Sequence, residues 1–184
     1  MFETNSSSMH SLIVLKDMHE RFPKTANWKE EQNADGTYTI VAGDNDFGRV
    51  PLYFLAHPVD KFLYLVADRY SRYSKDTTGR DNFIQNMIDK LDGCTAIEFS
   101  ENKWDGCIDY GYIDHQSTGL IWNYLDNNGI DAIEFIFDPK SVIIIDGDEY
   151  CAWDCVKDSG LVDLDNIEFE LNVHKEDPTW QSSL

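Results

Sequence analysis

The sequence predicts an α+β fold in a single domain, with a mixed or antiparallel sheet and about three helices. Three observations support this class. Several segments repeat apolar residues at helical spacing, several short apolar runs have the composition of strands, and turn-forming residues separate them. At 184 residues the chain can bury one good core and need not divide. We therefore expect one domain over residues 1–184, with a β-rich part at 1–50 and a frayed tail at 176–184.

The first strands are predicted from apolar runs bounded by turn residues. The run Leu12-Ile13-Val14-Leu15 predicts a strand over residues 11–16. A polar stretch with Pro23 follows, and Asn33-Ala34-Asp35-Gly36 is a turn signal that leads into a predicted strand over 37–42. The N-terminal part should therefore be rich in β-structure.

Two helices and a strand are predicted in the middle of the chain. Apolar residues recur at helical spacing over 59–73, with Pro58 near the start. A second helix is predicted over about 80–91, where Gly93 is a plausible terminator. The residues 95–99 then have the composition of a strand.

The third helix and the last strands complete the prediction. The helix should begin after Ser117 or Thr118 as its cap and end at Asn127-Asn128-Gly129. The apolar runs 130–137 and 141–145 are predicted to be buried strands at the centre of the sheet.

The segment 166–173 alternates apolar and polar residues, which is the pattern of a strand with one buried face. Such a strand would project Glu168 and Glu170 from one face, about 6.8 Å apart. A row of fixed carboxylates can imitate a phosphate backbone, and it is equally what a solvated strand face looks like.

The formal net charge of −19 is concentrated in the second half of the chain. Residues 101–184 hold 19 acids against 4 bases, whereas residues 1–100 hold 15 against 11. Because phosphate binding requires Lys and Arg, this distribution opposes direct nucleic-acid binding. The same field favours a basic protein surface as partner, and a groove that holds DNA or guide RNA is such a surface. Solubility alone is the other explanation of these acids.

The near-terminal segment Glu3-Thr4-Asn5-Ser6-Ser7-Ser8-Met9-His10-Ser11 gathers hydroxyl, amide, carboxylate and imidazole groups directly before a predicted strand. Chain ends usually fray, so this composition suggests a segment that is held in place. The segment resembles the N-terminal E-T-N-S-S-S-x-H-S motif of small proteins from bacteriophages and mobile elements of Gram-positive hosts. The resemblance implies a phage-type accessory protein made in a bacterial cytoplasm. Inhibitors of host defence, including anti-CRISPR proteins, are common among such proteins.

Charge and resemblance together give the leading hypothesis, which is binding and not catalysis. The protein would inhibit a host defence complex, such as a CRISPR effector, by occupying its basic groove as a nucleic-acid mimic. Tyr and Trp are frequent anchors of protein interfaces, although they are also ordinary strand residues. The predicted partner-binding residues lie in one acidic and aromatic segment and in the last predicted strand: Asp105, Asp109, Tyr110, Tyr112, Glu168 and Glu170.

The alternative hypothesis is a small enzyme that modifies a nucleotide or a protein. An imidazole and nearby hydroxyls can form a nucleophile with its base, and Ser6, Ser8, His10 and His115 supply these groups. The polar segment that contains His115 stands just before the third predicted helix, where a helix cap is the competing explanation. The sequence alone does not bring the two segments together.

Neither a cofactor nor a metal ion is predicted. The chain contains neither phosphate-binding glycine motif, and its acidic clusters lack the spacing of an EF-hand. The spacings of Cys94, Cys107, Cys151 and Cys155 are loose for zinc, so free thiols are expected. No segment approaches the ~20 apolar residues of a membrane span, and a secretory signal is not recognised. A cytoplasmic protein is therefore expected.

Overall fold

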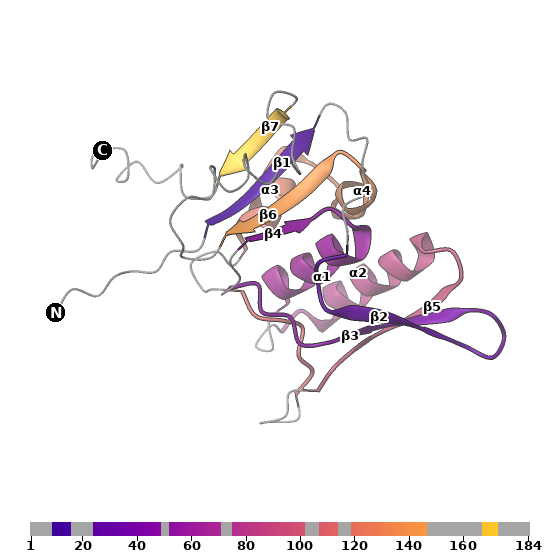
Figure 1. Ribbon diagram of the computed structural model, residues 1–184. Helices are drawn as coiled ribbons and strands as arrows, with labels where there is room; N and C mark the ends of the chain where they lie inside the picture. The colour runs from indigo at the N-terminus through magenta and orange to yellow at the C-terminus, as the bar shows by residue number, and fades with distance from the viewer. Residues whose placement is uncertain are drawn as a thin grey trace, which may run out of the picture.

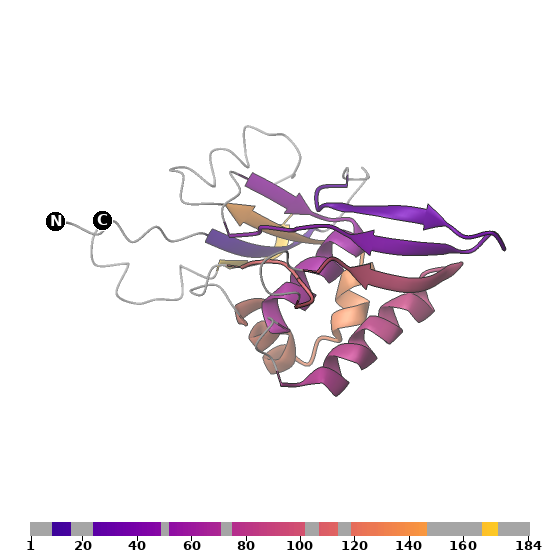
Figure 2. The ribbon, with the colours of Figure 1, turned by 90° about the horizontal axis from the view of Figure 1, so that it is seen from below.

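The computed structural model of the protein arranges its strands and helices in two layers. It describes residues 9–15, 24–48, 52–70, 75–101, 107–113, 119–146 and 167–172, with the backbone alone in 9–15 and 167–172. Within these residues the strands form one layer and four helices lie together on one side of it (Figure 2). The predicted α+β class is confirmed.

The larger sheet has four strands in the order β4-β6-β1-β7 (Figure 1). Its central strands β1 and β6 carry the apolar runs of the sequence, and every neighbouring pair is antiparallel. The strands are β1 (Met9–Leu15), β4 (Leu52–Leu55), β6 (Ser141–Asp146) and β7 (Ile167–Asn172). Three of these four strands confirm the predictions made over 11–16, 141–145 and 166–173.

The smaller sheet has the order β2-β3-β5. The strands β2 (Trp28–Gln32) and β3 (Tyr38–Ala42) form an antiparallel hairpin, and β3 pairs in parallel with β5 (Cys94–Phe99). The predicted turn closes this hairpin, with the Gly36 N–H donating to the Asn33 carbonyl at 3.1 Å. The predictions of β3 and β5 are confirmed.

Two strands, β2 and β4, were not predicted. In β2 only Trp28 is buried and the other four residues are exposed, so the sequence lacks the alternation that marks a strand. The strand β4 has only 4 residues. Both are formed through pairing with neighbouring strands, β3 and β6, which a local pattern does not reveal.

Helix α1 (Pro58–Arg69) is the central helix of the fold. Every residue from Val59 to Asp68 is buried, as expected for a helix surrounded by core elements. Its N-cap is His57, whose Nδ1 accepts the Val59 N–H at 3.2 Å. Pro58 suits the first turn because its missing N–H needs no partner there. The prediction over 59–73 is confirmed, with an earlier end.

Helices α2 (Thr77–Lys90) and α3 (Leu120–Asn128) are also confirmed. Asp76 caps α2 by accepting the Gly79 N–H at 2.8 Å, which starts this helix before the predicted residue. Gly129 ends α3 with a φ of 64°, a left-handed conformation that favours glycine. The predicted caps of α3, at 117 and 118, lie outside the described residues.

The prediction of a strand over 130–137 was wrong. Residues Ala132–Phe137 form helix α4, which Asp131 caps by accepting the N–H groups of Ile133 and Glu134, both at 2.9 Å. A short apolar run does not distinguish a buried strand from a buried helix. The combination of Asp131 with Glu134 three residues later is a helix-start signal that resolves the choice.

Aromatic rings join the first three helices. The Phe83 ring of α2 lies 5.3 Å from Phe62 of α1 and 5.1 Å from Trp122 of α3, measured between ring centroids. Trp122 also donates its indole N–H to the Leu65 carbonyl at 2.7 Å. The indole is therefore both packed and hydrogen-bonded, as buried Trp generally requires.

Three charged residues of α1 are buried, and each binds a different neighbouring segment. The first is Asp60, whose carboxylate accepts the Thr25 N–H at 2.7 Å and the Trp28 indole N–H at 2.6 Å. Burial raises the pKa of Asp60, while these hydrogen bonds favour its ionised form. The carboxylate thereby attaches the start of β2 to the first turn of α1.

The second is Lys61, whose ammonium group binds the turn between α4 and β6. Its Nζ lies 3.2 Å from the Phe135 carbonyl, 2.9 Å from that of Asp138 and 3.1 Å from that of Ser141. The Ser141 hydroxyl lies at 2.7 Å. Burial lowers the pKa of Lys61 to about 7, and the nearby Asp138 carboxylate opposes this change. Lys61 thus stabilises the carbonyl end of α4.

The third is Asp68, near the end of α1. Its Oδ1 accepts the Gly119 N–H at the start of α3, where no side chain of α3 itself provides a cap. The second oxygen, Oδ2, is buried and has no hydrogen-bond partner among the described residues. Burial raises the pKa of Asp68 to about 7. A carboxyl group from another helix therefore accepts the N–H of the residue that caps α3.

Candidate partner-binding site

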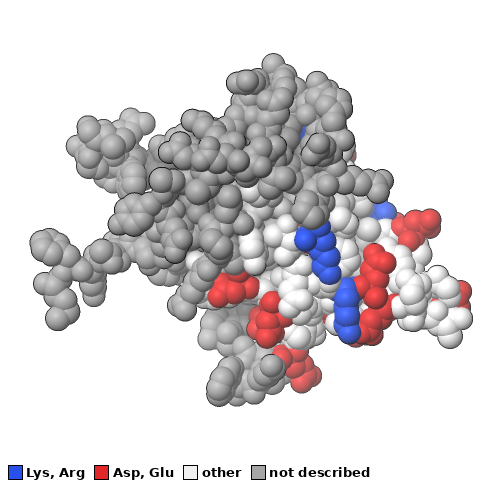
Figure 3. All heavy atoms as spheres, viewed as in Figure 1, with Lys and Arg blue, Asp and Glu red and all other residues white. Residues whose placement is uncertain are grey.

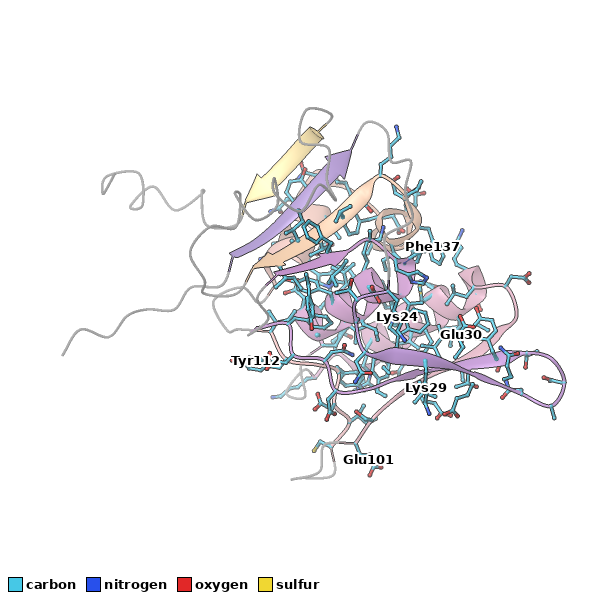
Figure 4. All side chains as sticks on the ribbon, viewed as in Figure 1. Lys24, Lys29, Glu30, Glu101, Tyr112 and Phe137 are labelled. Atoms are coloured by element: carbon cyan, nitrogen blue, oxygen red, sulfur yellow. The ribbon has the colours of Figure 1, made fainter. Side chains whose placement is uncertain are left out.

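Three segments are joined near the end of β3, where Figure 4 shows Tyr112 at the left of the molecule and Glu101 below it. Backbone bridges join Asp46 to Tyr112 and Glu101 to Ile108. The Asp109 N–H also donates to the Ser100 carbonyl at 2.8 Å. The segments 43–48, 99–101 and 107–113 therefore form one continuous surface although they are far apart in the sequence.

The side chain of Asn45 holds the first of these segments in place. Its Oδ1 accepts the Asn27 N–H at 2.7 Å, and its Nδ2 donates to the Gly43 carbonyl at 3.0 Å. Its backbone carbonyl accepts the Tyr112 N–H at 2.8 Å, and the Tyr112 carbonyl accepts the Phe47 N–H at 2.8 Å. The loop is fixed by hydrogen bonds and so presents its acids in a defined position.

We call this surface the acidic face. Its apolar members, Ile108 and Tyr112, are 48% and 46% exposed, whereas most large apolar side chains among the described residues are buried or half-buried. Figure 4 shows Glu101 and Tyr112 both pointing outward from the ribbon. The acidic face comprises Asp44, Asp46, Glu101, Ile108, Asp109 and Tyr112.

Three of the four residues predicted between 105 and 112 lie in the described part of the structure, and their exposure differs. Tyr112 is exposed and Asp109 is half-buried, with its Oδ1 accepting the Gly111 N–H at 2.9 Å. Tyr110 is only 8% exposed, and its ring packs against Phe99 at a centroid distance of 4.9 Å. Tyr110 therefore supports the surface from inside. Asp105 lies outside the described residues.

Gly111 allows the segment to approach the body of the protein. Its φ of 105° favours glycine, and an added Cβ would lie 3.2 Å from the Asn45 carbonyl oxygen and 3.3 Å from the Ala67 Cβ. We expect Gly111→Ala to lower the free energy of unfolding by about 1–3 kcal/mol, because both backbone strain and crowding oppose the new methyl group. Urea denaturation measures this change.

Gly36→Ala is the matched control for this prediction. Gly36 has a φ of 86°, and no atom lies within 4 Å of an added Cβ, so this variant reports backbone strain without crowding. Gly111→Ala should be the less stable of the two variants. Equal stability of the two variants would show that the close approach of the segment at Gly111 contributes nothing.

Acidic side chains dominate the exposed surface of the described residues, as the predominance of red over blue in Figure 3 shows. The exposed bases number six: Lys24, Lys29, Arg69, Lys75, Lys90 and Lys140. The exposed acids number fourteen: Glu30, Glu31, Asp35, Asp44, Asp46, Asp76, Asp81, Asp89, Asp92, Glu98, Glu101, Asp126, Asp131 and Glu134. The excess of acids thus extends to the first half of the chain.

The remaining predicted residues are placed only in part. His10 lies in β1 and pairs with Ile145, and Glu170 lies in β7 and pairs with Ile13. The β1–β7 register shifts beside Glu168, so the ladder is irregular where two regularly spaced carboxylates were predicted. Ser6, Ser8 and His115 lie outside the described residues, as do the side chains of His10, Glu168 and Glu170. The described residues do not test the proposed enzyme site.

Sequence reasoning missed Asp44 and Asp46, which the fold brings beside Tyr112. The pattern Asp44-Asn45-Asp46 after a predicted strand was the available signal, since Asn and Asp are typical of ordered turns. Its proximity to the 107–113 segment depends on tertiary contacts that a local pattern does not contain.

No family model matches the chain, and neither a curated protein nor a solved structure matches it. Within the described residues no group of three or more His, Cys, Asp or Glu side chains is arranged to hold a metal ion. In the same residues no helix has both the length and the apolar character needed to cross a membrane.

Proposed function

We propose that the protein is a phage-type inhibitor that binds the basic nucleic-acid groove of a host defence complex of the CRISPR-effector class. It acts as a nucleic-acid mimic, in the cytoplasm of the bacterial host. The observation that carries this proposal is the acidic face, where exposed carboxylates lie on the same joined segments as two exposed apolar side chains. The resemblance of residues 3–11 to a motif of phage proteins supports the same origin.

The charge of the acidic face determines the kind of partner that suits it. Carboxylates at Asp44, Asp46 and Glu101 attract a lysine- and arginine-rich surface and repel phosphate groups. Long-range attraction of this kind increases the association rate and is weakened by salt. The partner is therefore a basic protein, and not DNA or RNA itself.

The apolar side chains of the acidic face add binding free energy that its charges alone do not provide. Exposed surface ion pairs contribute only about 0–1 kcal/mol each, because water and salt screen them. A buried aromatic anchor contributes about 2 kcal/mol or more at the centre of an interface. Tyr112, which is exposed and bridges the Asp46 backbone, fits such an anchor, and Ile108, which bridges Glu101, is a second exposed apolar side chain of the acidic face.

The test compares two variants with equal changes of charge. The first carries Asp44→Asn, Asp46→Asn and Glu101→Gln, which keep the acceptor oxygens that bind Ser100 and the Gly48 N–H. The control variant neutralises three exposed acids on helices α2, α3 and α4, namely Asp89, Asp126 and Glu134. Each protein is immobilised and incubated with a panel of purified CRISPR effector complexes.

The proposal expects wild type and control to retain an effector that the acidic-face variant loses. Tyr112→Ser should weaken the same complex about tenfold or more without unfolding the protein, because the ring is half exposed in the free state. Equal retention by the acidic-face variant and the control would refute the role of this face. Failure of wild type to bind any member of a broad panel would count against the whole proposal.

A further inference from the structure

A cavity of about 340 Å³ lies on a different part of the molecule, between the first turn of α1 and the turn that joins α4 to β6. Pro58, Ile136, Phe137 and Pro139 form most of its apolar wall. Phe137 lies at the end of α4 (Figure 4) and is half-buried. The polar groups of the cavity come from His57, Lys61 and Asp138.

Lys61 lines this cavity but is not available to a ligand. Its three N–H donors are shared among four oxygen atoms of Phe135, Asp138 and Ser141. The side chain is fully buried, and burial lowers its pKa to about 7. All of its N–H donors are directed to these oxygens, so the lysine offers no donor to a ligand, and its lowered pKa weakens its repulsion of a cation at pH 8.

His57 contributes a neutral ring. Its Nδ1 accepts the Val59 N–H, which places the imidazole proton on Nε2 in the neutral form. Burial lowers the pKa of His57, which favours the neutral form of the ring. The ring also packs against Trp28, with 5.1 Å between the centroids. A cation in the cavity meets no positive charge from this residue.

Asp138 supplies the negative charge of the cavity. Its Oδ1 accepts the Lys140 N–H at 2.9 Å, and its other carboxylate oxygen has no hydrogen bond among the described residues. Asp138 is half-buried, and the Phe137 ring precedes it in the chain. The exposed bases Lys24 and Lys140 do not line the cavity. A carboxylate, an aromatic ring and apolar walls therefore share one opening.

We propose that this cavity binds an arginine side chain of the basic partner. The planar guanidinium donates to the free carboxylate oxygen of Asp138 and packs against the Phe137 ring, while the arginine methylene groups contact Pro58 and Pro139. Arginine fits better than lysine, because its planar group is less strongly hydrated and stacks on rings. The source of the arginine rests on the proposed function, whereas the binding chemistry of the cavity does not.

The test uses three acetylated and amidated tripeptides, Gly-Arg-Gly, Gly-Lys-Gly and Gly-citrulline-Gly, titrated at pH 8 into the full-length ¹⁵N-labelled protein. Citrulline has the shape of arginine without its charge. The arginine peptide should shift the amide signals of the non-proline residues in 56–61 and 136–140 and bind about tenfold more tightly than the citrulline peptide. Equal binding of these two peptides, or shifts confined to other residues, would overturn the proposal.

Two variants make the test specific to the cavity. Asp138→Asn keeps the acceptor for the Lys140 N–H but removes the charge, and it should weaken binding of the arginine peptide about tenfold. Glu134→Gln, an exposed acid on α4, should leave that binding unchanged. If Asp138→Asn fails to fold, Phe137→Leu removes the aromatic ring and should weaken arginine binding more than citrulline binding. Unaltered arginine binding in the folded cavity variant refutes the proposal.

The outcomes separate this inference from the proposed function. Loss of effector binding by the acidic-face variant, with no binding of the arginine peptide, would overturn the arginine site alone. Arginine binding in the cavity, with no effector retained by wild type, would support the site and count against the partner. Loss of effector binding by both the acidic-face variant and Asp138→Asn would support both.

Discussion

Replacing Lys61 with alanine should lower the free energy of unfolding by about 3 kcal/mol, which corresponds to a decrease in Tm of about 6–12 °C for a chain of this size. Two losses add in the variant. The carbonyl groups of Phe135, Asp138 and Ser141 lose a charged donor, and the missing methylene groups leave a cavity beside a fully buried position. The variant also no longer pays the free-energy cost of burying a charged group, but this gain offsets only part of these losses.

Thermal and urea denaturation at pH 6 measure this effect, since Lys61 is mainly charged below its pKa of about 7. Lys61→Met restores most of the volume but none of the donors, so the loss that remains measures the hydrogen bonds. Lys140→Ala, at an exposed position near the same turn, should change stability by less than about 0.5 kcal/mol. A stability of Lys61→Ala within 1 kcal/mol of wild type would mean that Lys61 does not hold α4 and β6 together.

Asp68→Asn should change stability in a manner that depends on pH. In the folded protein burial raises the pKa of Asp68 to about 7, from a value near 3.8 in the unfolded chain. Between these two pH values the folded state binds one proton more than the unfolded state. The stability contributed by this raised pKa is therefore complete below pH 3.8 and is lost as the pH rises through about 7.

The asparagine variant does not titrate at this position and still offers an oxygen to the Gly119 N–H. The free energy of unfolding of wild type, minus that of Asp68→Asn, should fall by about 1.4 kcal/mol per pH unit between pH 4 and 7 and then level off. Urea denaturation across this pH range measures the difference. Asp89→Asn, at an exposed position on α2, serves as the control and should show a flat difference. A flat difference for Asp68→Asn would show that its folded pKa is not raised.

Local sequence patterns predicted those helices and strands whose own residues have a recognisable apolar pattern. The buried run in β6 and the period of α1 were recognised because their side chains repeat at the spacing of one structure. The helix α4 was mistaken for a strand because its run of 6 residues has no clear period, although Asp131 and Glu134 mark a helix start. The strand β2 was missed because its side chains are mostly exposed.

The buried charges of α1 and the acidic face depend on contacts between distant segments. Lys61 binds residues that follow it by more than seventy positions, and Asp68 binds the N-cap residue of α3, Gly119, which lies 51 positions later. The sequence singled out Asp109 and Tyr112 as a contact surface, but Asp44 and Asp46 join them only in the folded chain. Local charge patterns reveal exposed acids, and the tertiary fold decides which of them form one surface.

The most direct test of the central claim is competition between this protein and nucleic acid for one effector groove. The dissociation constant of the protein–effector complex is measured by titration calorimetry at increasing concentrations of duplex DNA that the effector binds. Mimicry predicts that the apparent dissociation constant rises in proportion to the DNA concentration, and that the acidic-face variant fails to displace the DNA. An unchanged dissociation constant, with protein and DNA bound to the effector together, would show that the protein does not occupy the nucleic-acid groove.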